Sequence, residues 1–162
     1  MQSDFSQIKA FVLDVDGVLT DGTLYCFGSG EQVRAFNIKD GYAIRNAINK
    51  GFLVAVITAK NEQSVRMRLV QLGIVDLYMG SENKLETFKT YINEKQLDPN
   101  NVLYMGDDVP DLEVMQFAGI AACPADAADD VLQIARYKCE KNGGKGAVRE
   151  VIEKVLRSQE KW

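Results

Sequence analysis

Residues 11–20 read FVLDVDGVLT, an apolar run that ends in two carboxylates separated by one residue. Successive side chains of a β-strand point to opposite faces, so Asp14 and Asp16 would share a face if the strand continued. Gly17 follows directly and allows the chain to turn there. The stretch therefore predicts a buried strand whose end presents a pair of carboxylates to solvent.

The rest of the sequence has the composition of an ordinary globular domain. Of its 162 residues, 46% are hydrophobic and 26% are charged, so we expect a single domain over residues 1–162. The formal net charge of −4 and the lack of a basic block argue against a nucleic-acid partner. Residues 1–7 do not resemble a secretory signal, and no apolar run approaches the length of a membrane span. We therefore expect a cytoplasmic protein without a membrane partner.

Cysteine and histidine usage restricts the chemistry further. The three cysteines are widely spaced without a CxxC pair, so we expect packed thiols rather than a disulfide or a zinc site: Cys26, Cys123 and Cys139. The sequence contains no histidine, which excludes Ser-His-Asp and Cys-His catalysis. Any catalysis must depend on carboxylates, lysines, hydroxyls and an oxygen-ligated metal.

Strand-like and helix-like segments alternate along the chain. Short apolar runs predict further strands at 53–57, 77–79, 102–105, 120–123 and 137–139. Helical spacing predicts helices at 40–50, at 61–72 with Asn61 as its cap, at 125–134 and at 147–157. Another helix should begin near Lys84, and a separate one should follow Asp111 and end at Ala118. The alternation predicts an α/β fold, a Rossmann-like three-layer α/β/α core with a mainly parallel sheet.

One segment departs from this alternation. Residues 22–27 and 31–37 are β-prone and flank the turn Gly28-Ser29-Gly30, which predicts a β-hairpin. This hairpin, about residues 21–37, would project as a flap beside the carboxylates. It is the longest insertion, so we expect no separate cap domain. The C-terminal tail, about residues 142–162, begins with a glycine-rich loop.

Polar side chains gather where the expected parallel strands end. Ligand sites in such sheets lie beyond the carboxyl ends of the strands. The side chains expected there are Asp14, Asp16, Thr58, Lys84, Asp107, Asp108 and Asp111. Crowded carboxylates raise one another's pKa, so a bound cation is their natural partner. All-oxygen ligation favours Mg²⁺, and a phosphate would supply further oxygens. Asp111 could equally complement the dipole of its own helix.

These motifs resemble those of the haloacid-dehalogenase superfamily of phosphatases. The resemblance rests on DVDG at 14–17, Thr58 after an apolar strand, Lys84, and GDD at 106–108 with Asp111. The longer stretches DVDGVLTDG (14–22), FNIKDG (36–41), YMGDDVPD (104–111) and GGKGAVRE (143–150) resemble a small capless branch of that superfamily. The resemblance covers about residues 8–156. It implies hydrolysis of a keto-sugar acid phosphate, most closely 3-deoxy-D-manno-octulosonate 8-phosphate, in lipopolysaccharide precursor synthesis.

The resemblance also implies a role for each residue. Asp14 would be the nucleophile that forms an aspartyl-phosphate, and Asp16 the general acid and base. Mg²⁺ would be held by Asp14, the backbone carbonyl of Asp16 and Asp107. Asp108 or Asp111 would assist in the second shell or through water, while Thr58 and Lys84 would bind the phosphoryl oxygens.

Two further expectations concern the sugar and the assembly. Members of this branch often have Thr-Gly-Arg where this chain has Thr58-Ala59-Lys60, and Asp-Lys where it has Asn83-Lys84. Lys60 should lie near the sugar, where a point charge replaces a planar donor. Members also form homotetramers, so we expect the hairpin to mediate assembly. We expect Lys145 or Arg149 to reach the site of an adjacent subunit.

Other functions fit parts of the pattern. The same chemistry could act on a nine-carbon nonulosonate 9-phosphate. A non-catalytic oligomerisation module of the same fold would lack one carboxylate or the lysine, and none is missing here. A receiver-type phosphoacceptor domain also uses an aspartate at a strand end, but places it on a middle strand, whereas this pair lies on the first.

Overall fold

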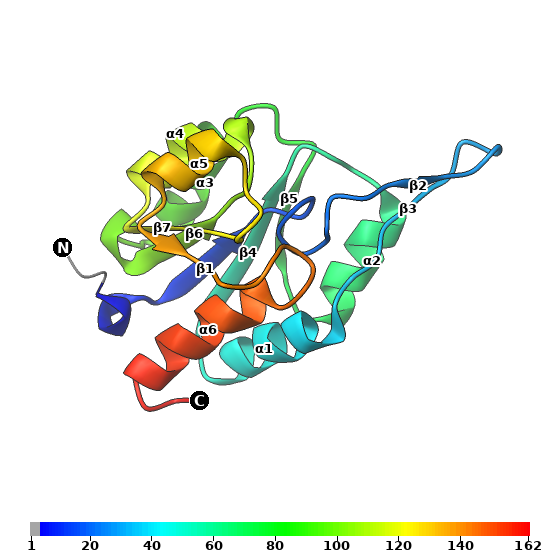
Figure 1. Cartoon of the computed structure of the whole chain (residues 1–162). Coiled ribbons are helices and arrows are strands. Elements are labelled where there is room, and N and C mark those ends of the chain that lie inside the picture. The colour runs from blue at the N-terminus through cyan, green and yellow to red at the C-terminus, as the bar shows by residue number, and fades with distance from the viewer. Residues whose placement is uncertain (1–3) are drawn as a thin grey trace.

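The computed structural model describes residues 4–162, which form a parallel β-sheet between two helical layers (Figure 1). The sheet has six strands in the order β5-β4-β1-β6-β7-β8, and every neighbouring pair is parallel. The strands are β1 (Ala10–Leu13), β4 (Leu53–Thr58), β5 (Asp76–Met79), β6 (Val102–Met105), β7 (Ile120–Cys123) and β8 (Tyr137–Lys138). The predicted α/β fold with a mainly parallel sheet is confirmed.

Helices cover both faces of this sheet. One layer contains α1 (Ile38–Asn49), α2 (Gln63–Gln71) and α6 (Ala147–Ser158). The other contains α3 (Lys84–Glu94), α4 (Leu112–Phe117) and α5 (Asp129–Ile134). Short 3₁₀ turns lie at Phe5–Gln7, Pro99–Asn101 and Val109–Asp111. Within residues 4–162, none of the helices combines the length and the apolar character needed to cross a bilayer.

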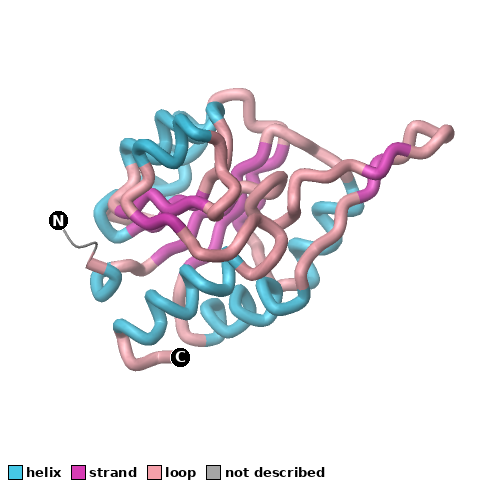
Figure 2. The backbone as a smooth tube through the Cα atoms, in the orientation of Figure 1, coloured by secondary structure: helices cyan, strands magenta, loops and turns pink. Residues whose placement is uncertain are grey.

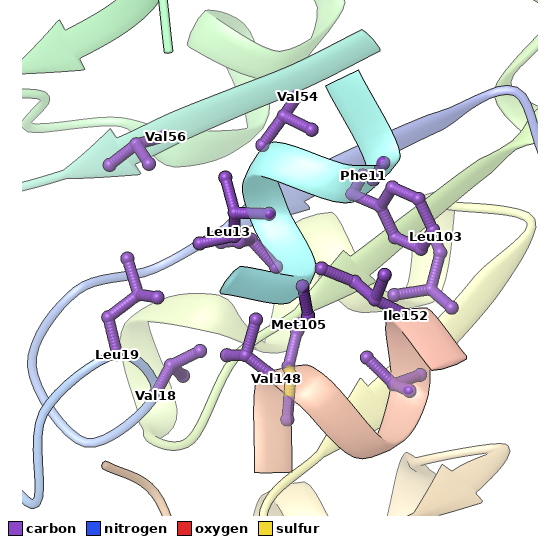
Figure 3. Close-up of a cluster of buried hydrophobic side chains, with 14 of the residues drawn as sticks. Phe11, Leu13, Val18, Leu19, Val54, Val56, Leu103, Met105, Val148 and Ile152 are labelled. Atoms are coloured by element: carbon purple, nitrogen blue, oxygen red, sulfur yellow. The ribbon is translucent and has the colours of Figure 1, made fainter. Parts of the chain in front are cut away.

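Strand β1 is central and is buried on both of its faces. Phe11 and Leu13 pack toward α1 and α6, while Ala10 and Val12 pack toward α3 and α4. Figure 3 shows the first of these clusters, where side chains from β1, β4, β6 and α6 meet. Burial on both faces explains why this stretch is continuously apolar instead of alternating with polar residues.

The strand order reverses beside β1. The chain runs outward from β1 to β4 and β5, then returns across the sheet to place β6 on the other side of β1. Loops that leave adjacent strands in opposite directions open a crevice at their carboxyl ends. The residues that follow β1 and β6 therefore border the same crevice.

The predicted hairpin is present, with shorter strands than expected. Its strands β2 (Tyr25–Cys26) and β3 (Gln32–Val33) pair antiparallel and form a two-stranded sheet of their own. The hairpin projects from the body of the molecule (Figures 1 and 2). No helical layer covers either face of the β2 and β3 residues, which are exposed. Such a ribbon is stable only where it gains contacts at its base or with a partner.

Two helix starts differ from the sequence prediction. Helix α2 begins at Gln63 with Glu62 at the N-cap, so Asn61 does not cap it. Helix α5 begins at Asp129, not Ala125, and the segment before it bonds instead to the loop before α6. The Ala125 N–H donates to the Lys141 carbonyl at 2.9 Å. Ala128, at the N-cap of α5, has φ −58° and ψ 148°, so the chain is not helical immediately before Asp129.

The cysteines are all free thiols, as expected, but only two of them are packed. Cys123 and Cys139 are buried, whereas Cys26 is exposed on the hairpin. The expectation of a packed thiol is therefore wrong for Cys26, because the hairpin strand that carries it is not covered by another layer.

Candidate active site

A cavity of about 320 Å³ lies at the carboxyl ends of β1, β4 and β6. Its lining includes most of the side chains that the sequence predicted, namely Asp14, Asp16, Thr58, Lys60, Lys84, Asp107, Asp108 and Asp111. Gly17, with φ +81°, permits the loops after β1 and β6 to meet, because a Cβ there would overlap the Asp107 carboxylate. The strand order thus brings together residues that lie far apart in the sequence.

Lys84 is the buried cation of this cavity. Its ammonium lies 2.9 Å from Asp14 Oδ2 and 2.8 Å from Asp111 Oδ1. Burial lowers the pKa of Lys84, but the two carboxylates outweigh it and raise that pKa above its ordinary value. A lysine at the positive N-terminus of α3 needs such partners. Lys84 is therefore held charged and in a defined place.

Asp111 organises the loop that follows β6. Its Oδ1 accepts hydrogen bonds from Lys84 Nζ at 2.8 Å and from the Tyr104 hydroxyl at 2.7 Å. Its Oδ2 accepts from the backbone N–H groups of Asp107 at 3.0 Å and Asp108 at 3.3 Å. Both oxygens of this fully buried carboxylate are committed to donors within the protein. Asp111 thus fixes the backbone that carries Asp107. An aspartate that only complemented the dipole of its own helix would not need these contacts.

Asp14 and Asp107 are close together, and both have a raised pKa, so they are the acidic groups best suited to bind a cation. One oxygen from each lies within 4.8 Å of the other and of an Asp111 oxygen. Burial, and then the Asp111 charge, raise the pKa of Asp14, although Lys84 opposes them. Burial and the neighbouring aspartates raise the pKa of Asp107 to about 7. A hard divalent cation that prefers oxygen ligands fits this pair, because it would offset both burial and repulsion.

The Asp16 side chain is bound by a residue that the sequence analysis missed. Arg34, from the hairpin, donates from Nε to Asp16 Oδ1 at 2.6 Å and from Nη2 to Oδ2 at 3.3 Å. Arg34 Nη1 also lies 3.5 Å from Glu62 Oε2. Arg34 is the only basic residue between Thr20 and Lys39. A single cation on a hairpin expected beside carboxylates is the sequence feature that could have indicated this ion pair.

Thr58 is buried, whereas Lys60, two residues later, is exposed. Thr58 is buried at the end of β4, where its Oγ1 accepts a hydrogen bond from the Lys60 N–H at 3.3 Å. Lys60 itself is exposed, and it contributes to the cavity lining. The hydroxyl is therefore held inside the cavity, whereas Lys60 lines the cavity as an exposed residue.

Lys145 and Arg149 lie outside this cavity within one chain. They line a separate cavity of about 640 Å³ with other charged residues of α6 and neighbouring segments, among them Lys39, Lys141, Lys154 and Arg157. Lys145 Nζ lies 3.8 Å from Asp21 Oδ2. The Arg149 guanidinium packs over the rings of Tyr42 and Trp162, at 5.8 and 5.3 Å from their centroids. The predicted contact of either residue with an adjacent subunit stays a prediction.

The glycine-rich loop before α6 supports the first carboxylate loop. Gly143 packs so closely on the Gly17 carbonyl that a Cβ at position 143 would overlap it. The Gly144 N–H donates to the Val18 carbonyl at 3.0 Å. These contacts hold the backbone that follows Asp16 in place.

The sequence matches a family of hydrolases, and its fold matches solved structures of related enzymes. The chain belongs to the haloacid dehalogenase-like hydrolases, a family that matches residues 69–152. It is 43% identical over 154 residues to the 3-deoxy-D-manno-octulosonate 8-phosphate phosphatase KdsC of Salmonella typhi, covering 95% of this chain and 82% of that protein.

Solved structures of enzymes with that name have the same fold. The 3-deoxy-D-manno-octulosonate 8-phosphate phosphatase of Yersinia pestis matches with a TM-score of 0.95 and 39% identity, over 97% of this chain and 85% of that one. The enzyme of Moraxella catarrhalis, solved with magnesium ion, phosphate ion and KDO, matches with a TM-score of 0.94 and 31% identity. That match covers 96% of this chain and 90% of the Moraxella chain.

Proposed function

We propose that this protein is a Mg²⁺-dependent phosphatase that hydrolyses 3-deoxy-D-manno-octulosonate 8-phosphate to the free keto acid and phosphate. The observation that carries the reaction class is the buried cluster in which Lys84 pairs with Asp14 beside Asp107. The substrate is proposed from the relatives, whose names specify the eight-carbon acid phosphate and favour it over a nine-carbon one. The reaction belongs in lipopolysaccharide precursor synthesis.

Asp14 acts as the nucleophile in this proposal. One of its oxygens attacks phosphorus, the bond from phosphorus to the sugar oxygen breaks, and the phosphoryl group passes to Asp14. Water then attacks the same phosphorus, which releases phosphate and restores the carboxylate. The carboxylate is held for this attack by the Val15 N–H, which donates to Oδ1 at 2.7 Å, and by Lys84 at Oδ2.

Asp16 moves the protons in both steps. It donates a proton to the sugar oxygen as that group leaves, and then accepts a proton from the attacking water. Asp16 lies two residues after Asp14, lines the same cavity, is bonded to Arg34 and is only partly buried. Lys84 and the Thr58 hydroxyl stabilise the charge on the transferring phosphoryl oxygens.

The donor set suits Mg²⁺, which would be held by Asp14, Asp107 and the backbone carbonyl of Asp16, with Asp108 acting through water. When bound, the ion neutralises the carboxylates and draws charge from the phosphoryl oxygens. Asp111 is proposed to hold the Asp107 backbone and Lys84 in place, since its oxygens already accept four hydrogen bonds. Lys60, at the edge of the cavity, is proposed to attract the sugar carboxylate.

Turnover of a panel of phosphate esters tests the substrate. With Mg²⁺ present, we expect kcat/KM for 3-deoxy-D-manno-octulosonate 8-phosphate to exceed that for a nonulosonate 9-phosphate by at least about tenfold, because the pocket must fit one carbon chain length. Release of inorganic phosphate measures both reactions. Sugar phosphates without a carboxylate, such as glucose 6-phosphate, serve as controls. Equal turnover of all these esters would contradict the proposed specificity.

We further propose that the protein acts as a homotetramer in which a neighbouring subunit helps to close the site. Support comes from the hairpin, where large apolar side chains are exposed: Leu24, Tyr25, Phe27 and Val33. Clustered apolar exposure of this kind marks protein contacts. A site without its own cap also needs a neighbour to exclude water during phosphoryl transfer. Lys145 or Arg149 of that neighbour would then reach the substrate.

Making the hairpin polar tests the assembly. We expect a Tyr25→Ser, Phe27→Ser double variant to sediment as a smaller species than the wild type, because it removes apolar contact area between subunits. Val75→Ser is the matched control, since Val75 is also exposed but lies away from the hairpin. If the double variant and the wild type sediment alike, the hairpin does not mediate assembly.

The domain organisation and the cellular location complete the proposal. The chain is proposed to act as a single domain, with the hairpin in place of a cap. The three free thiols suit a reducing compartment, which supports a cytoplasmic location.

A further inference from the structure

Arg34 is an unusual residue in the hairpin. Neighbouring side chains there are exposed, yet the Arg34 side chain is only 1% exposed and lies against the body of the protein. Its guanidinium contacts Asp16, in the loop after β1, and Glu62, at the N-cap of α2. A single side chain thus joins three segments around the cavity.

The contacts of Arg34 with Asp16 are unequal. The bond from Nε to Oδ1 is 2.6 Å long, whereas the bond from Nη2 to Oδ2 is 3.3 Å long. Two donors on a planar guanidinium fix the plane of a carboxylate as well as its position. Oδ1 is therefore the anchored oxygen, and Oδ2 is the oxygen that is more easily released toward a ligand.

The contact of the Arg34 guanidinium with Glu62 is longer than its two contacts with Asp16. Arg34 Nη1 and Glu62 Oε2 form an ion pair at 3.5 Å, and neither of these buried atoms makes a hydrogen bond of good geometry. The shortest contact of the guanidinium is therefore the one to Asp16, at 2.6 Å.

We propose that Arg34 is a positioning residue that orients Asp16 and makes that orientation depend on the hairpin. The inference rests on the proposed function in one respect, namely that Asp16 transfers protons. Arg34 holds Oδ1, which leaves Oδ2 to exchange a proton with the sugar oxygen and then with water. Displacing the hairpin would withdraw Arg34 and leave the Asp16 side chain free to rotate.

Steady-state kinetics of Arg34 variants test this assignment. We expect Arg34→Met to lower kcat about 10- to 100-fold while KM changes less than about threefold, because the substrate still binds but the proton donor is misaligned. Arg34→Lys should recover only part of the loss, since an ammonium cannot donate in a planar pair. Glu31→Gln, on the exposed part of the same hairpin, is the matched control. An unchanged kcat in Arg34→Met would overturn the proposal.

Amide hydrogen exchange supplies a second test that does not depend on turnover. We expect residues 22–36 to exchange at least about fivefold faster in both Arg34→Met and Asp16→Asn than in the wild type, because each variant breaks the same tie between hairpin and body. Unchanged exchange in either variant would overturn the coupling. A wild-type protein that hydrolyses no phosphate ester would refute the proposed function alone, because the exchange rates still decide whether Arg34 joins the hairpin to Asp16.

Discussion

Replacing Asp14 with asparagine is expected to lower phosphate release by a factor on the order of 10⁴ or more, the scale at which loss of a nucleophile abolishes covalent catalysis. The amide has nearly the same shape but lacks the anionic oxygen that must attack phosphorus. The fold should survive, because Lys84 keeps its second partner, Asp111, at 2.8 Å. Phosphate release under saturating substrate and Mg²⁺ measures the loss, and circular dichroism measures the fold.

A trapping experiment identifies the residue directly. Wild-type protein quenched in acid during turnover should carry phosphate on the peptide that contains Asp14, as mass spectrometry would detect. The control is Asp130→Asn, which neutralises an exposed carboxylate in the first turn of α5 and should leave turnover within about twofold. Measurable phosphate release by the Asp14 variant in a folded state would exclude Asp14 as the nucleophile.

Replacing Asp107 with asparagine is expected to weaken Mg²⁺ binding at least about 100-fold and to abolish turnover with it. In the metal-free wild type, burial and neighbouring aspartates raise the pKa of Asp107 to about 7. Below pH 7 this carboxyl binds a proton that Mg²⁺ must displace, so affinity in the wild type should fall as the pH is lowered from about 8 to 5.5. Titration calorimetry at several pH values measures both effects. A Kd for Mg²⁺ that does not change over this range would contradict the role of Asp107.

The same substitution should stabilise the metal-free protein at neutral pH. A carboxyl whose folded-state pKa lies above its unfolded value keeps a proton that the unfolded chain releases, so stability falls as the pH rises between about 4 and 7. Asparagine carries no such penalty. In EDTA at pH 7.5, we expect Asp107→Asn to unfold with a free energy higher by on the order of 2 kcal/mol, a gain that shrinks toward pH 4. Urea denaturation at both pH values measures it, and added Mg²⁺ should reverse the order.

Much of the fold and of the cavity was predictable because it depends on local patterns. A strand buried on both faces must be continuously apolar, and residues 10–13 are. Parallel strands end at one edge of their sheet, so residues such as Thr58 and Asp107 were expected near Asp14 from their positions after apolar runs alone. Their common cavity confirms that placement.

The contacts within the site were less predictable, because they join segments that are distant in the sequence. Arg34 was missed because the path of a projecting hairpin depends on contacts at its base, not on its own residues. The task of Asp111 depends on Tyr104 and on Lys84, 27 residues away, which no spacing rule relates to it. Helix α5 starts later than its sequence pattern indicates because Ala128 has a non-helical backbone, and Ala125, which precedes it, bonds to the distant loop before α6.

The sequence by itself determined which residues can do chemistry here: a chain without histidine offers carboxylates, hydroxyls and lysines, and its strand ends select among them. Only the tertiary structure decided how their charges are balanced. Lys84 is shared between Asp14 and Asp111, while Asp16 is paired with Arg34 from the hairpin. The reason is physical. Residue types and strand ends follow from short stretches of sequence, but the partner of a buried charge does not. That partner depends on which side chains the whole fold places within hydrogen-bonding distance of the charge.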